Sequence, residues 1–139
     1  ARCPSPSTIT MFDNGVHRRG IEYSRAIEID TRTRKVVWEY TDNPPFTLYT
    51  IMGGCVLRLA NGNTLITETS KGHFLEVTKD NKVVWEYINP FFTSNPRLGG
   101  RMNMVFRAHR YSPDYEGLKG RNLDPENLAN LNRLYGPEA

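Results

Sequence analysis

Arginine and histidine side chains gather in two parts of the chain, where they could bind an anion. One cluster is His17-Arg18-Arg19; the other contains Arg107 and His109, which are two positions apart. On a strand, Arg107 and His109 would point to the same side. Guanidinium and imidazolium groups hold oxyanions through charge-assisted hydrogen bonds. We therefore weigh an anion-binding pair at Arg107 and His109 against the alternative of solvated surface.

The segment Asp13-Asn14-Gly15 also allows two interpretations. It can be a turn held by hydrogen bonds from the Asp side chain, or its Asn14 can belong to a central binding site. His17 can line a pocket or be a solvated loop residue. His73 lies within a repeated segment, which favours a structural role.

Composition narrows the classes of function. The chain has 139 residues, a net charge of +3 and charges that alternate in sign along its length, so we expect no nucleic-acid partner. Its apolar runs are too short to span a bilayer. The two cysteines, Cys3 and Cys55, form no C-x-x-C pair, and we expect no metal and no cofactor. They could form one disulfide or remain two thiols.

The strongest pattern is an internal repeat. Lys35-Val36-Val37-Trp38-Glu39-Tyr40 recurs as Lys82-Val83-Val84-Trp85-Glu86-Tyr87, and Arg25–Asp30 corresponds to His73–Thr78. A period of 40 to 50 residues with several short strands is typical of propeller blades. We expect Trp38 and Trp85, at equal positions of the repeat, to pack between neighbouring blades.

The repeat predicts an all-β fold of about two four-stranded β-propeller blades. Apolar and polar residues alternate in segments such as 56–59 and 64–67, which an Asn-Gly turn of the primed type would join. Residues 1–7 form an N-terminal extension, 8–47 the first repeat and 48–90 the second. Residues 91–118 hold an irregular loop to Arg101 and an extra strand over 104–111. Residues 119–139 form a tail with a short C-terminal helix, capped by Asp124 and carrying leucines at helical spacing.

An ordered set of motifs resembles the C-terminal half of the arylsulfotransferase family over residues 8 to 118. The set consists of Phe12-Asp13-Asn14-Gly15, Tyr23-Ser24-Arg25, Glu28-Ile29-Asp30, Val37-Trp38-Glu39-Tyr40, Leu59–Ile66, Phe74-Leu75-Glu76-Val77 and Phe106-Arg107-Ala108. The resemblance implies a six-bladed propeller that moves a sulfuryl group from a phenolic sulfate ester to a phenol. It also implies a transiently sulfated histidine, no nucleotide donor and a periplasmic or secreted location.

Carried over residue by residue, the resemblance gives Arg25 and Arg107 as substrate-binding candidates beside Asn14, His17 and His109. The family's nucleophilic histidine precedes the Phe-Asp-Asn-Gly element, and residues 1–7 contain no histidine. Val105-Phe106 stands where the family carries His-Tyr. The catalytic residues of this chain therefore stay unknown, and the nucleophile is expected outside it.

Two functions remain open at this point. The chain can belong to a sulfotransferase-like enzyme, or it can be a non-catalytic propeller module for binding or assembly. Both need partners, because two blades cannot close a ring. We expect further blades from a missing segment or from other chains.

Overall fold

The computed structural model describes residues 2–5, 7–96, 100–129 and 133. It divides the chain into two compact units, Ala1–Ala108 and His109–Ala139. Strands dominate the first unit, and the second contains only short 3-10 turns among its described elements. No helix in the described part of the chain is long and apolar enough to cross a membrane.

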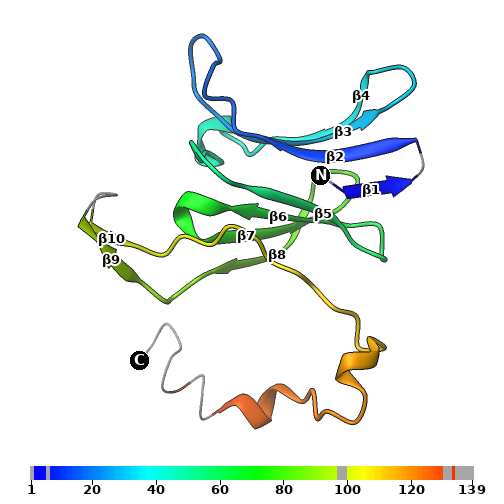
Figure 1. The fold of residues 1–139 in the computed structure, drawn as a ribbon, viewed down its shortest axis with the longest axis vertical. Coiled ribbons are helices and arrows are strands. Elements are labelled where there is room, and N and C mark those ends of the chain that lie inside the picture. The colour runs from blue at the N-terminus through cyan, green and yellow to red at the C-terminus, as the bar shows by residue number, and fades with distance from the viewer. Residues whose placement is uncertain (1, 6, 97–99, 130–132, 134–139) are drawn as a thin grey trace. The chain divides into compact units, whose positions relative to one another are not determined.

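The first unit is built on two four-stranded antiparallel sheets, seen one above the other in Figure 1. Each sheet follows the chain order as a meander. The first contains β1 (Arg2–Ser5), β2 (Thr8–Asp13), β3 (Arg25–Asp30) and β4 (Val36–Tyr40). The second contains β5 (Cys55–Arg58), β6 (Thr64–Glu68), β7 (His73–Val77) and β8 (Val83–Ile88). These sheets confirm the expected all-β class, but they do not close into a ring.

The core lies between the sheets. It combines residues of the first sheet and of the connection between the sheets with residues of the second; its buried members are Ala26, Tyr40, Leu48, Val56, Ile66, Leu75 and Val77. Strand β6 is buried along its whole length, whereas β8 is exposed along its whole length. Strand β6 lies between β5 and β7, and even its polar residues Thr64, Thr67 and Glu68 are buried.

One hairpin turn differs from the expected type, and two others contain a non-glycine residue with a positive φ. Between β5 and β6, only Gly62 takes a positive φ, of 86°, so the connection is not a primed turn. Gly62 N–H donates to the Leu59 carbonyl and Leu59 N–H to the Asn63 carbonyl. Asn81 has a φ of 63° in the turn between β7 and β8. Arg34 has a φ of 59° between β3 and β4.

The segment 1–7 is more than an extension, because it contains β1. This strand pairs with β2, at Arg2 opposite Thr10 and Ser5 opposite Thr8. The first sheet therefore has four strands, of which the apolar alternation in the sequence marks only three. A four-residue strand that contains a proline shows too little alternation to be recognised.

Residues 91–112 also differ from expectation. The expected irregular loop contains a hairpin of β9 (Thr93–Asn95) and β10 (Gly100–Met102). The expected strand over 104–111 is wrong, since residues 103–112 contain no strand. Asn89 and Asn103 donate side-chain hydrogen bonds to each other's carbonyls, at 3.1 and 3.0 Å, which fixes the chain at the end of the second sheet.

The second unit contains two 3-10 turns, η4 (Glu116–Leu118) and η5 (Pro125–Leu128). The Asp124 carboxylate accepts a hydrogen bond from Glu126 N–H at 3.0 Å, so the expected cap is present. The expected C-terminal helix is represented by this turn, and residues 130–132 and 134–139 lie outside the described part.

Candidate functional site

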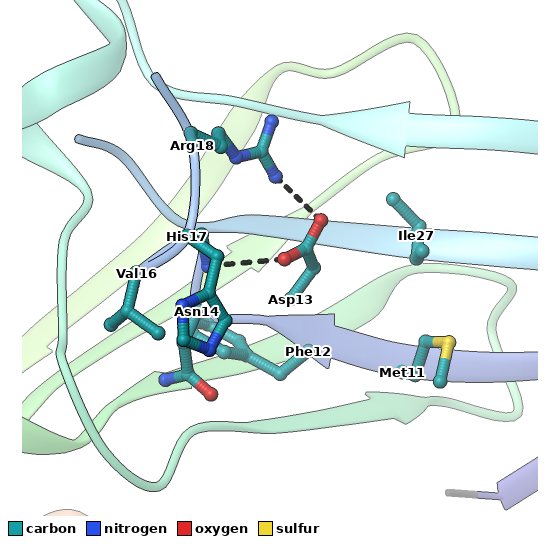
Figure 2. Close-up of a pocket in the computed structure, with 9 residues that line it drawn as sticks. Met11, Phe12, Asp13, Asn14, Val16, His17, Arg18 and Ile27 are labelled. Carbon is teal, nitrogen blue, oxygen red and sulfur yellow. Dashed lines mark hydrogen bonds and ion pairs between the residues drawn. The ribbon is translucent and has the colours of Figure 1, made fainter. Parts of the chain in front are cut away.

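The loop after β2 lines a pocket of about 610 Å³ on the first sheet (Figure 2). Its wall combines apolar side chains of β2 and β3 with polar residues of the loop; it is lined by Met11, Phe12, Asp13, Asn14, Gly15, Val16, His17, Arg18 and Ile27. Asn14 and His17, two of the sequence candidates, thus lie in one pocket. Such a pocket is large enough for a small aromatic ligand.

Asp13 organises the charges beside the pocket. Its Oδ1 accepts a hydrogen bond from Gly15 N–H at 3.0 Å, which confirms the expected Asx turn. Its Oδ2 accepts from Arg18 Nη2, drawn in Figure 2, and from Arg25 Nε at 2.8 Å. The other end of Arg25 donates from Nη1 to Glu39 at 2.6 Å. The hydrogen bond to Asp13 raises the pKa of Arg25 most, and Glu39 raises it further.

These bonds define what Arg25 does. Its guanidinium joins two carboxylates on different strands, so it positions the loop rather than pointing freely at a ligand. Arg18 remains as the cation at the pocket wall. Its guanidinium lies 4.2 Å from the centre of the Tyr23 ring, and its Nε is buried without a hydrogen-bond partner among the described residues.

Asn14 and Ser24 tie the loop to the connection between the two sheets. Asn14 Nδ2 donates to the carbonyls of Thr50, at 2.8 Å, and Gly53, at 2.9 Å. Ser24 Oγ donates to the Asn14 carbonyl and accepts from Thr50 N–H. Both side chains therefore hold the pocket loop in place across more than twenty residues of sequence.

Glycine is needed at two positions, at Gly54 where the connection passes the first sheet and at Gly15 in the pocket loop. Gly54 has a φ of 91°, and a Cβ placed there would lie 2.3 Å from the Phe12 ring. Gly15 has a φ of 74°, and its Cβ would lie 2.1 Å from the Tyr23 carbonyl oxygen. Only glycine allows the backbone to approach this closely in the left-handed region.

His17 lines the pocket but is exposed. The remaining candidates, Arg107 and His109, are not among the residues that line it. Arg107 and His109 are exposed and lie in no strand, and Arg107 belongs to the first unit while His109 opens the second. The expectation that Arg107 and His109 lie on one face of a strand is therefore wrong, because there is no strand at these positions. The His109 ring lies 6.4 Å from the ring of Tyr111.

The two tryptophans have different surroundings. Trp38 packs against the core between the sheets, donates from Nε1 to the Lys79 carbonyl at 3.1 Å and lies under the Arg58 guanidinium. Arg58 in turn pairs with Glu28 of the first sheet. Trp85 stacks on Tyr87 of its own strand and is 40% exposed.

His73, expected to be structural, lies between two carboxylates at the end of the second sheet. Its Nδ1 is 2.9 Å from Glu68 Oε2 and its Nε2 is 2.6 Å from Glu86 Oε1. The hydrogen bond to Glu68 raises the pKa of His73. Burial alone would raise the pKa of Glu68, but hydrogen bonds from His73, Lys71 and Tyr49 N–H lower it.

Sequence reasoning treated Arg18 only as one member of a basic run. The signal that separates Arg18 from Arg19 is its spacing of five residues from Asp13, the carboxylate that it contacts across the turn. No group of three or more His, Cys, Asp or Glu side chains in the described ranges could hold a metal ion. Cys55 is a free, partly buried thiol, and the side chain of Cys3 lies outside the described part.

Comparison with known proteins gives one match. The sequence profile of the family described as arylsulfotransferase (ASST) matches residues 4–90. Searches of curated proteins and of solved structures give no match. The matched residues include both sheets and the pocket loop and exceed half of the chain, so the protein belongs to the arylsulfotransferase family.

Proposed function

We propose that this chain is part of an arylsulfotransferase-like β-propeller that transfers a sulfuryl group from a phenolic sulfate ester to a phenol. The observation that carries the proposal is the family match over residues 4–90. The proposed location, periplasmic or secreted, rests on the same membership. No nucleotide donor is needed, because the ester itself supplies the activated sulfuryl group.

The propeller arrangement is supported by the way the two sheets pack. Their closest approach is at the first strands, with β1 and β2 against β5. Sheets that radiate from a common axis approach each other most closely at their inner strands. The repeated tryptophan supports the same arrangement, because Trp38 packs on the next sheet and Trp85 occupies the equivalent position one sheet further along.

In the proposed reaction, a histidine nitrogen attacks the sulfur while the S–O bond of the ester breaks and a phenolate leaves. The oxygen of a second phenol then attacks the same sulfur, the S–N bond breaks, and the acceptor's proton passes to a base. Charge develops on the peripheral sulfuryl oxygens, which fixed donors stabilise. Arg18 is placed to supply one such donor, since it lines the pocket and its side chain is 21% exposed.

The nucleophile is proposed to lie outside this chain. His73 has both ring nitrogens bound to carboxylates, and neither His17 nor His109 stands in the family's motif position. A propeller places residues of several blades around one channel, so a histidine of another blade can face the Arg18 pocket.

A direct assay tests the proposal. The protein encoded by the complete open reading frame is incubated with 4-nitrophenyl sulfate, with and without a phenol acceptor, and nitrophenolate release is followed. We expect acceptor-dependent release, lowered about tenfold or more in Arg18→Met by loss of a transition-state hydrogen bond. Arg19→Met, which removes an exposed neighbouring charge, serves as the matched control. Absence of release from the complete protein would reject sulfuryl transfer.

One observation favours a second candidate, a non-catalytic propeller module for binding or assembly. Arg25 and Asn14, two of the substrate-binding candidates, are engaged in bonds that hold the scaffold. A complete protein that folds but transfers no sulfuryl group would support this candidate.

A further inference from the structure

His17 is held at the tip of a turn in the pocket loop. It is a central residue of the β-turn from Gly15 to Arg18, in which Arg18 N–H donates to the Gly15 carbonyl at 3.0 Å. Asp13 holds both ends of this turn, because its carboxylate accepts from Gly15 N–H at 3.0 Å and from Arg18 Nη2. The backbone that carries the His17 imidazole is therefore fixed, although the residue is exposed.

The imidazole of His17 is not engaged by the described part of the protein. His17 lines the pocket, and its side chain makes no hydrogen bond, ion pair or ring contact with a described residue. His73 is the opposite case, because both of its ring nitrogens contact carboxylates. A neutral imidazole has one nitrogen with a lone pair, and it takes up a proton near neutral pH. The pocket thus contains a side chain that can accept a proton from a ligand.

Arg18 and His17 line the pocket from different directions. Figure 2 shows them on opposite sides of Asp13, and the apolar side chains of Met11 and Ile27 belong to the same lining. An aryl sulfate combines an apolar ring with an anionic group, so its ring suits the apolar lining and its sulfuryl oxygens suit the guanidinium of Arg18. An acceptor phenol that reaches the same sulfur then has His17 as the histidine of this pocket.

The other titratable side chains of the pocket are poorly suited to take a proton. Asp13 is a carboxylate, but its oxygens already accept hydrogen bonds from Gly15 N–H, Arg18 and Arg25. Arg18 is a guanidinium, which has no acceptor atom. These two residues and His17 are the titratable groups that line the pocket. Of the three, His17 is therefore the one with a free lone pair in its neutral form.

We propose that His17 is the general base that takes the proton of the acceptor phenol in the second half of the sulfuryl transfer. The phenol oxygen forms a bond to sulfur while its O–H bond breaks and the proton passes to the neutral imidazole of His17. The S–N bond breaks at the same time, and its electron pair returns to the nucleophilic histidine. The His17 imidazolium then releases the proton to water. The inference rests on the proposed function, whose reaction needs such a base.

The two half-reactions of the complete protein separate this role from the others. Nitrophenolate release from 4-nitrophenyl sulfate without an acceptor measures the first half-reaction, which needs no base. Transfer to an added phenol measures the second. His17→Gln is expected to slow transfer to unsubstituted phenol about 100-fold, because general-base catalysis typically contributes at least this factor. Pentafluorophenol is already ionised in the assay, so transfer to it should slow by less than about threefold.

His109→Gln is the matched control, because it makes the same change at an exposed histidine that does not line this pocket. It should transfer to phenol at the rate of the wild type, and circular dichroism establishes that both variants fold. The proposal is overturned if His17→Gln transfers to phenol like the wild type. It is equally overturned if the variant loses phenol and pentafluorophenol to the same extent.

Binding of 4-nitrophenol gives a second readout that needs no sulfuryl transfer. At a pH where free 4-nitrophenol is mostly protonated, the wild type is expected to increase its phenolate absorbance, since His17 accepts the proton of the bound phenol. His17→Gln should show no such increase, and an equal increase in both proteins would overturn the proposal. Ionisation of bound 4-nitrophenol without release from the sulfate ester would reject the proposed transfer and leave the proton acceptor identified.

Discussion

Individual side chains around the pocket hold the scaffold more than they face a ligand. Asn14 is the clearest case, because its amide satisfies two backbone carbonyls of the connection between the sheets. A buried or partly buried acceptor that loses its donor costs more free energy than the net value of the hydrogen bond. The main role of Asn14 is therefore to stabilise the fold.

Asn14→Ala is expected to lower the free energy of unfolding by about 2 kcal/mol, because two carbonyls lose their donor. Urea unfolding followed by circular dichroism measures the change. His17→Ala, three residues further on at an exposed position, should stay within about 0.5 kcal/mol of the wild type. Equal stability of the two variants would show that the Asn14 contacts contribute nothing to folding.

Gly54 gives a second prediction at this scale. Gly54→Ala is expected to cost about 2 kcal/mol or more, since the left-handed φ is strained and the added methyl meets the Phe12 ring. Gly20→Ala has a similar φ of 96° and open space around it, so it isolates the backbone term. Thermal unfolding of both variants separates the two effects, and a Gly54→Ala loss no larger than that of Gly20→Ala would contradict the steric argument.

At the scale of elements, the His73 cluster joins three neighbouring strands of the second sheet. Glu68 ends β6, His73 begins β7 and Glu86 lies on β8, while Tyr49 N–H adds the connection from the first sheet. The protonated imidazole can donate to both carboxylates, whereas the neutral ring has one N–H. The cluster therefore depends on pH.

Because the folded pKa of His73 is raised, its stabilisation is fully present below the unfolded value of about 6.5 and is lost as pH rises through the folded pKa. The lowered pKa of Glu68 acts oppositely: its contribution is present above about 4.5 and is lost as pH falls. We expect stability to drop by about 1 kcal/mol above the folded pKa of His73. Urea unfolding as a function of pH, compared with His73→Gln, measures this drop. If the free energy of unfolding of the variant falls in the same way as pH rises, the His73 cluster does not cause the drop.

The elements that sequence predicts best are the ones carried by the internal repeat. Segments 26–29 and 74–77 occupy equivalent positions of the repeat, and both are strands. The expected strand over 104–111 is misleading, because a local sequence shows that a strand could form but not that a free strand edge is available to pair with. The small hairpin of β9 and β10 is the opposite case. Its Asn, Pro and Gly content is typical of an irregular loop, yet its two strands pair.

The candidate site was predictable only in part. The Asx turn at Asp13 follows from local chemistry, because donor and acceptor are two residues apart. The bonds of Asn14 to Thr50 and Gly53 span 36 and 39 residues, and those of Arg25 depend on which strands become neighbours. No local pattern reports such distances, so the structural role of these candidates becomes visible only in the fold.

At the scale of the whole molecule, the chain consists of two units that meet between Ala108 and His109. Residues 103–112 contain no strand, and Arg107 and Arg110 are exposed. Limited trypsin digestion is expected to cut first after these arginines, since proteases prefer exposed segments without regular structure. Mass spectrometry of the early fragments tests this, with Lys82, which is also exposed and lies in the turn between β7 and β8, as the internal comparison. A first cut at Lys82 would contradict the division.

Trp38 and Trp85 have different surroundings, so their intrinsic fluorescence can report on the fold without a label. Trp38, held at the seam between the sheets by the Lys79 carbonyl, should emit at shorter wavelength and resist acrylamide quenching. Trp85, which is 40% exposed, should quench more readily. Acrylamide quenching can thus follow loosening of the seam through Trp38, with the more exposed Trp85 as the internal reference.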